Sequence, residues 1–336
     1  MLVPAHVERL KPKSNEFQLM KLGDIYRKIV DMGIDADPRG RDRVNQILEK
    51  SKKDLEKLEG KKKELADKDV TWNPYTDCRL LYGEEDREIT SLLSGIDIGT
   101  GEIVLADRLA DKGSKIDLVL AHHPHGIGIS NLDYVMKIQP EQWAAVGVPI
   151  AQAESAMAAR LKEVHFSTKP RNHTQVTDAA RLIDMPFMCS HTPADSIGYQ
   201  FLTKYLKDKD PSTLGNLVEV LLEIPEYQEA EKVGAGPEIL VGSDDGSVGE
   251  KFVFFTGGTS AGPKSIPKLA HAGVSTIITM HMGENVKKAC EEEGLYVVIA
   301  GHDSSDSIGM NIILDTLQKE GVKSYTCSGF TRHSRL

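Results

Sequence analysis

The sequence contains two related segments, CSHTPADSIGYQFL at residues 189–202 and AGHDSSDSIGMNII at residues 300–313. Each has a histidine, three further residues and then Asp-Ser-Ile-Gly, and the apolar residues that follow have the spacing of one helix face. Each copy also follows a strand-like segment, PFMCS in the first and LYVVIAG in the second. The repeat therefore predicts a duplicated strand–turn–helix unit, with a histidine in the turn and an aspartate in the first helical turn.

Strand-like and helical patterns alternate around both copies, which is typical of an α/β fold. Residues 1–85 differ, because they contain two helical patterns, at 15–34 and 41–67, and the second of these is rich in Lys, Glu and Asp. We therefore predict a helical N-terminal extension over 1–85 and a duplicated α/β body over 86–336, with halves at about 86–210 and 211–336. The predicted strands of the body lie at 91–99, 116–123, 238–242, 251–258, 275–281 and 295–302.

Histidines and aspartates gather at the ends of these predicted strands. Imidazole and carboxylate groups are common ligands of Zn, Mn, Fe, Ni and Co. A lone His-x-x-x-Asp would usually be structural, but two copies with the same tail, together with His-His-Pro at a strand end, favour a metal site. Six such groups exceed the needs of one tetrahedral ion, so the pattern predicts two divalent ions ~3.5–4 Å apart. The candidate residues are His122, His123, His191, Asp195, His302 and Asp306.

A glycine-rich turn, within TGGTSAGPKSIPKLAHAG at 256–273, joins a predicted strand to a helical stretch. Glycines let backbone N–H groups approach an anion, and a helix N-terminus favours negative charge. A tight strand-to-helix connection explains the same pattern equally well. Close to a metal pair, the turn would bind a phosphate or carboxylate group. Its candidate substrate-binding residues are Gly257, Gly258, Ser260 and Gly262.

Composition excludes several other classes of protein. The 336 residues carry 41 Lys and Arg against 50 Asp and Glu, a net charge of −9, which disfavours a general nucleic-acid binder. The four cysteines show no Cys-x-x-Cys spacing, so neither a zinc–thiolate site nor a disulfide framework is expected. No apolar run approaches the ~18 residues of a membrane span, and no signal peptide is visible. We therefore expect a cytoplasmic protein with no membrane partner.

Five motifs in order resemble the Nif-three-like family of dinuclear metal proteins, whose members often carry the label type 2 GTP cyclohydrolase I. They are HHP at 122–124, HTxxD at 191–195, the Gly-Gly turn at 257–262, the GE pair at 283–284 and GHxxxD at 301–306. The resemblance, over about residues 86–336, implies a duplicated α/β unit with a two-metal site in the cleft between its halves, and a homo-oligomer, often a toroidal hexamer. It implies His191 as a ligand or the adjacent acid/base, and as ligands His122, His123, Asp195, His302 and Asp306.

The chain departs from the family pattern in three respects. Asp306 stands where the family usually has Glu, which is one methylene longer. The segment between HHP and HTxxD is longer than usual, and the N-terminal helical arm is extra. Substrate choice and assembly are therefore the least transferable properties.

The leading hypothesis is a two-metal hydrolase that activates a water molecule against a small anionic substrate, such as a nucleotide or phosphate ester. His191 is the predicted catalytic residue for proton transfer, because it duplicates His302 yet is not needed as a ligand once the site is filled. An alternative is a non-catalytic metal-binding scaffold or regulatory protein that uses the helical arm for interactions. A phosphate-binding module without metal would fit the glycine turn but would leave the His/Asp repeat unexplained. Five or six protein ligands for two ions leave room for water, which favours catalysis.

Overall fold

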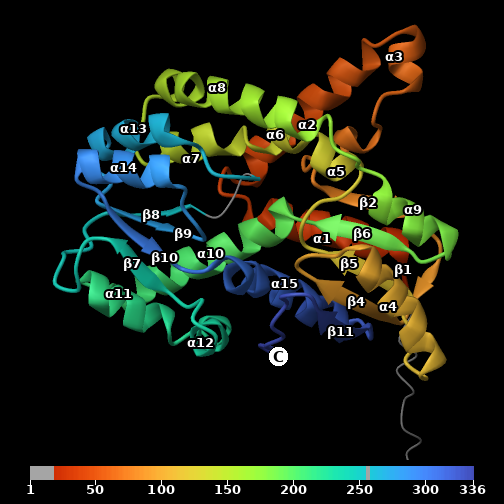
Figure 1. Cartoon of the computed structure of the whole chain (residues 1–336). Helices are drawn as coiled ribbons and strands as arrows, with labels where there is room; N and C mark the ends of the chain where they lie inside the picture. The colour runs from red at the N-terminus through yellow and green to blue at the C-terminus, as the bar shows by residue number, and fades with distance from the viewer. Residues whose placement is uncertain (1–18, 255–257) are drawn as a thin grey trace, which may run out of the picture.

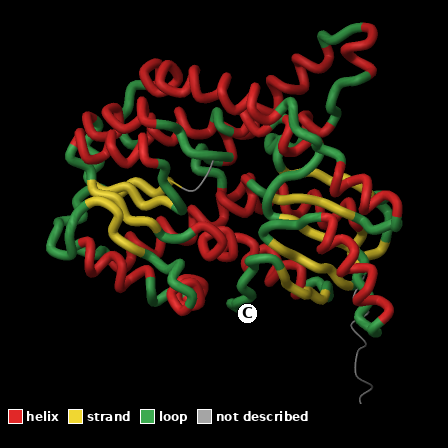
Figure 2. The backbone as a smooth tube through the Cα atoms, viewed as in Figure 1, coloured by secondary structure: helices red, strands yellow, loops and turns green. Residues whose placement is uncertain are grey.

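A computed structural model describes residues 19–254 and 258–336. Two β-sheets lie on either side of two central helices, α10 (Thr192–Lys209) and α15 (His302–Lys319), and further helices cover the outer faces (Figures 1 and 2). Both central helices begin in the repeated motif, one after a strand of each sheet. The predicted α/β fold with a duplicated unit is thereby confirmed.

The larger sheet has five strands in the order β11 (Lys323–Cys327), β4 (Ser91–Gly95), β5 (Leu118–Ala121), β6 (Phe187–Ser190) and β2 (Cys78–Tyr82). The first four are parallel, and β2 runs antiparallel to β6 at the edge. Every residue of β4, β5 and β6 is buried, as expected for the centre of a parallel sheet that is covered on both faces. A short antiparallel pair, β1 (Met20–Lys21) and β3 (Glu88–Ile89), lies apart from it.

The second sheet has four strands in the order β7 (Glu238–Val241), β10 (Tyr296–Ile299), β9 (Thr276–Thr279) and β8 (Lys251–Phe254). β8, β9 and β10 are parallel, and β7 is antiparallel to β10 at the edge. All four correspond to strands expected from the sequence. Each main sheet therefore combines a parallel core with one antiparallel edge strand.

The five-stranded sheet contains strands from all three predicted segments of the chain, 1–85, 86–210 and 211–336. β2 lies before residue 86, and β11 lies after residue 211, yet both pair within the five-stranded sheet. The reason is hydrogen bonding over long sequence distances, which the local pattern does not specify. The boundaries at 85/86 and 210/211 stay a prediction, whereas the sheet itself includes residues from both ends of the described chain.

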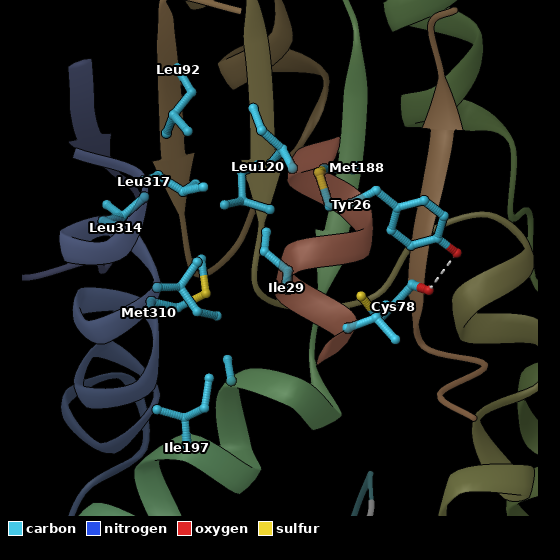
Figure 3. Packing of buried hydrophobic residues seen from close by; sticks show 14 of the residues in the cluster. Tyr26, Ile29, Cys78, Leu92, Leu120, Met188, Ile197, Met310, Leu314 and Leu317 are labelled. Carbon is cyan, nitrogen blue, oxygen red and sulfur yellow. Dashed lines mark hydrogen bonds between the residues drawn. The ribbon is translucent and has the colours of Figure 1, made fainter. Parts of the chain in front are cut away.

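The N-terminal helix α1 (Leu22–Ala36) belongs to the core of the molecule. Ile25 and Ile29 are fully buried, and α1 packs against the five-stranded sheet and the central helices. Figure 3 shows Ile29 close to Leu120 of β5 and Met188 of β6, with Leu314 and Leu317 of α15 nearby. This helix is therefore an integral layer of the fold rather than an added arm.

Of the rest of the predicted arm, the stretch around residues 50–64 projects from the molecule, whereas β2 belongs to the five-stranded sheet (Figure 1). The helix expected over 41–67 is broken into α2 (Arg41–Glu56) and α3 (Gly60–Glu64), followed by the short η1 (Asp69–Thr71). The apolar residues of this stretch have the spacing of one helix face, and of this apolar stripe Val44 is fully buried, while Leu65 is 83% exposed. The charged residues on the other faces remain in water, so the stripe contributes little to the core.

A helical segment connects β5 to β6 and packs on the other sheet. Trp143 and Met157 in this segment are fully buried against apolar residues of the four-stranded sheet and its helices. The segment thereby ties the two halves together across the top of Figure 1. Its helices are α5 (Ile127–Ser130), α6 (Leu132–Val135), α7 (Ile138–Ala145), α8 (Ile150–Thr168) and α9 (Gln175–Leu182).

The remaining helices cover the sheets: α4 (Thr100–Asp111), α11 (Leu214–Leu221), α12 (Pro225–Lys232), η2 (Pro263–Ser265), α13 (Ile266–His271) and α14 (Glu284–Glu293). Among the described residues, no helix combines the length and apolar content that a membrane span requires. All four cysteines are free thiols, in agreement with the sequence-based expectation.

Candidate metal centre

The predicted ligands lie where parallel strands end, between the two sheets. His122 and His123 follow β5, and His191 follows β6. His302 begins α15, one short turn after β10 of the other sheet. In open α/β sheets, ligands usually bind beyond the carboxyl ends of the strands. The duplicated unit therefore brings residues from both halves to one place.

The two central helices cross closely at the glycines of the repeated Asp-Ser-Ile-Gly motif. A Cβ atom on Gly309 would overlap the backbone carbonyl of Ala194 at the start of α10. A Cβ atom on Gly198 would lie 3.5 Å from the backbone oxygen of Ser305 in α15. The missing side chains let the backbones approach. This crossing brings the aspartates of the two motifs, three residues before each glycine, into the same cluster.

Asp306 is the central carboxylate of the cluster. Its Oδ1 lies 3.3 Å from Nε2 of His122, and its Oδ2 lies 3.5 Å from Nε2 of both His123 and His302. Oδ1 of Asp195 lies 3.4 Å from the same Nε2 atom of His122. The described residues form three groups of possible ligands, and within each group the ligand atoms lie within 4.8 Å of one another. The groups are His122, His123 and His191; His123, His302 and Asp306; and His122, Asp195 and Asp306.

Three of the histidines are oriented by a second hydrogen bond through Nδ1. His122 donates to the backbone oxygen of Ser190 at 3.2 Å. His123 donates to Asp97 at 2.6 Å, and His191 donates to Asp77 at 2.9 Å. Each bond fixes the proton on Nδ1 and leaves Nε2 directed at the cluster, which is the usual arrangement of a metal-binding histidine.

Several buried atoms of the cluster have no hydrogen-bond partner among the described residues. They are Nε2 of His122, Oδ1 of Asp195 and Oδ2 of Asp306. Such atoms are costly to bury unless something compensates them. A divalent cation would satisfy all three, so the residues present fit a metal ion.

The protonation states of the metal-free cluster also suit a cation. Burial lowers the pKa of His122 to about 4, so this ring is neutral near pH 7 and its Nε2 lone pair is available. Burial opposes the charge of Asp306, but the neighbouring imidazoles of His122, His123 and His302 outweigh it and hold the pKa of this carboxyl well below its usual range. Asp306 therefore stays ionised.

The buried pair of His191 and Asp195 holds at least one proton that a cation would displace. Burial lowers the pKa of His191, but the Asp195 and Asp77 carboxylates outweigh it and raise this pKa to about 9. Burial raises the pKa of Asp195 to about 8, against the opposing effect of His191. Metal ligands must lose such protons, so binding of a divalent ion is expected to release them.

All six candidates proposed from the sequence thus meet in one cluster. A small cavity lies beside the cluster and is lined by Asp195 and Asp306 together with Gly258 and Ser260 of the glycine turn. Gly262 lines neighbouring pockets, and Gly257 lies outside the described residues. His281 also lines this cavity, with its ring centroid 4.9 Å from that of His302. Gly258 and Ser260 of the glycine turn are therefore neighbours of the His/Asp cluster.

The sequence patterns did not indicate Asp77 and Asp97 as residues of the site. Asp97 lies within the SGIDIG segment, two residues after the end of β4, and this position just beyond a strand could have indicated a site. Asp77 is fully buried, precedes β2, and reaches His191 only because β2 pairs antiparallel with β6. Its segment was assigned to the N-terminal extension, so no local signal pointed to it. Asp77 also accepts hydrogen bonds from the backbone and hydroxyl of Thr192.

Comparisons with known proteins agree with this fold. No family model and no curated protein matches the sequence. Among solved structures, a NIF3 superfamily protein from Sphaerobacter thermophilus has a TM-score of 0.69 and 24% identity, over 86% of this chain and 98% of that one. Reduced HcgD from Methanocaldococcus jannaschii has a TM-score of 0.48 and 16% identity, over 82% of this chain and 96% of that one.

The Sphaerobacter structure shows that the chain has a NIF3-like fold, which confirms the fold expected from the motifs. At 24% identity the likeness concerns the fold and does not transfer an activity. The chemistry of this chain is therefore argued from its own cluster.

Proposed function

We propose that the chain is a dinuclear metal-dependent hydrolase that acts on a small anionic substrate, a nucleotide or a phosphate ester. The observation that carries this proposal is the set of inward-facing Nε2 atoms around two buried carboxylates, some of whose atoms lack partners. Two divalent ions, among Zn, Mn, Fe, Ni and Co, would supply a water of lowered pKa and polarise the substrate. Six protein ligands for two ions leave coordination positions for water and substrate.

The protein's own part is to fix the ligands and to balance the charge. Asp77 and Asp97 hold the rings of His191 and His123 by their Nδ1 atoms. Two buried carboxylates, Asp195 and Asp306, offset part of the charge that two divalent ions would bring.

For His191 we propose a ligand role rather than the proton-transfer role that the sequence suggested. Its Nδ1 bond to a carboxylate matches that of His123, and its Nε2 groups with those of His122 and His123. His191→Ala is therefore expected to lower the metal content of the purified protein. Full metal content with lost turnover would instead assign His191 to proton transfer.

The cavities around the cluster favour a substrate with an anionic end. Ser260 lines both the small cavity at the cluster, about 50 Å³, and a pocket of about 410 Å³ that also includes Arg160 and Lys264. His302 lines both the small cavity and a further pocket of about 600 Å³. Volumes of this size are typical of small-molecule sites. We propose that the pocket with Arg160 and Lys264, which Glu163 and Glu284 also line, receives the anionic group, and that the pocket beside His302 receives the rest of the substrate.

The test is a screen of nucleotides and phosphate esters with the protein loaded separately with each of the five metals. The proposal expects hydrolysis of at least one substrate, with loss of turnover in His123→Ala/Asp306→Ala. Absence of turnover in every metal form would overturn it and support the non-catalytic scaffold. Assembly into a homo-oligomer or hexamer stays a prediction, which the mass of the native particle in solution would decide.

A further inference from the structure

The helical segment between β5 and β6 holds the glycine turn of the other half. Gln139 of α7 is fully buried, and its Nε2 donates to the backbone oxygen of Thr259 at 2.6 Å. Arg160 of α8 donates from Nε to the backbone oxygen of Ser260 at 3.0 Å. Two consecutive carbonyl groups of the turn are thus bound by side chains that lie 100 or more residues earlier in the chain.

Apolar contacts reinforce these two bonds. Gly258 has a φ of +82°, and a Cβ atom there would meet Leu132 at 3.1 Å and Val135 at 3.2 Å, both on α6. Ala261 is buried in the same apolar cluster as Trp143. The turn is therefore packed against α6, α7 and α8 on one side, and its conformation depends on them.

The geometry of the peptide bond determines how the bonds of Gln139 and Arg160 orient the backbone of the glycine turn. In a trans peptide, the carbonyl group of one residue and the N–H group of the next point in opposite directions. Holding the carbonyls of Thr259 and Ser260 toward the helices therefore turns the N–H groups of Ser260 and Ala261 away from them. Within residues 19–254 and 258–336, no group accepts a hydrogen bond from either N–H. Thr259 and Ser260 line the cavity that contains Asp195 and Asp306.

We propose that Gln139 and Arg160 are positioning residues that aim the N–H groups of Ser260 and Ala261 at an oxygen of the anionic substrate. The two N–H groups form a donor pair for a phosphoryl or carboxylate oxygen beside the metal centre. Arg160 and Lys264 are the basic residues of the adjoining pocket, which Glu163 and Glu284 also line. The choice of substrate rests on the proposed function, whereas anion binding at the turn is a separate property.

Titration of the metal-loaded protein with inorganic phosphate, or with acetate as the carboxylate probe, tests the proposal. The backbone amide signals of Ser260 and Ala261 are followed by NMR, and the metal content is measured in parallel. Phosphate is expected to shift both signals in the wild-type protein. The double variant Gln139→Met/Arg160→Met is expected to keep its metal and to bind phosphate about tenfold more weakly, since it loses the two bonds that orient the donors.

Two further variants separate orientation from charge. Glu163→Gln removes the ion pair of Arg160 and an acidic group of the pocket but leaves the bond to Ser260, so it should bind phosphate at least as tightly as the wild type. Arg160→Lys keeps the charge but lacks the Nε donor, so it should recover only part of the affinity.

Unshifted amide signals, or equal phosphate affinity in the double variant, would overturn the proposal. If the double variant loses metal, the single variant Arg160→Met decides in the same way. Because the readout is binding rather than turnover, failure to find any hydrolysis would overturn the proposed function and leave this test intact.

Discussion

The two copies of the repeated motif share a histidine and the Asp-Ser-Ile-Gly sequence but differ in their surroundings. His191 in the first copy is 7% exposed and bonds through Nδ1 to the buried Asp77. The side chain of His302 in the second copy is 42% exposed, and among the described residues no hydrogen bond fixes its Nδ1. The duplication thus supplies similar ligands to the site. The bond to Asp77 fixes the histidine of the first copy, whereas the histidine of the second copy faces the pockets.

The two glycines of the motif are unequal as well. Gly309 lies against the backbone of Ala194, whereas Gly198 has ordinary spacing to α15. The largest expected effect on stability is therefore that of Gly309→Ala, about 3 kcal/mol or more, because backbone atoms cannot yield as a flexible side chain can. Urea unfolding measures it. Gly198→Ala is the matched control and should stay within about 1 kcal/mol of the wild type; equal losses would show that the crossing is symmetric.

The second comparison concerns the two carboxylates that orient histidines. Asp77→Asn is expected to weaken metal binding by about 10- to 100-fold, because it disturbs a buried partner of the site. Asp97→Asn should have a smaller effect, since the side chain of Asp97 is 75% exposed and water can replace it. Competition with a metal-binding dye gives both affinities. A larger loss of metal affinity for Asp97→Asn than for Asp77→Asn would contradict the inference that Asp77 fixes His191 more firmly than Asp97 fixes His123.

The smallest expected effect is that of His302→Ala on the stability of the metal-free protein, within about 0.5 kcal/mol, because this side chain is 42% exposed. His191→Ala should cost about 1 kcal/mol or more, since it removes a donor to the buried Asp77 carboxylate. Thermal unfolding of both chelator-treated variants measures the difference. A loss of stability as large in His302→Ala as in His191→Ala would remove the contrast between the copies.

Much of the site could be predicted because it is encoded locally. The repeated motif places a histidine and an aspartate at the start of a helix, and His122 and His123 directly follow a strand. The end of a parallel strand is the usual place for a ligand, so these residues could be expected to meet.

The parts that could not be predicted depend on contacts between distant segments. Asp77 reaches His191 through the antiparallel pairing of β2 and β6, which no local pattern shows. The helix α1 was assigned to an arm because its amphipathic pattern does not say what it packs against. The bonds of Gln139 and Arg160 to the glycine turn likewise join segments that lie 100 or more residues apart.

Metal analysis of the purified and reloaded protein tests the central claim most directly. The wild type should hold close to two divalent ions per chain, and His123→Ala/Asp306→Ala should hold essentially none while its circular dichroism stays that of a folded protein. A wild type that reloads with less than one ion, or a double variant with wild-type metal content, would contradict the assignment of this cluster as a dinuclear metal centre.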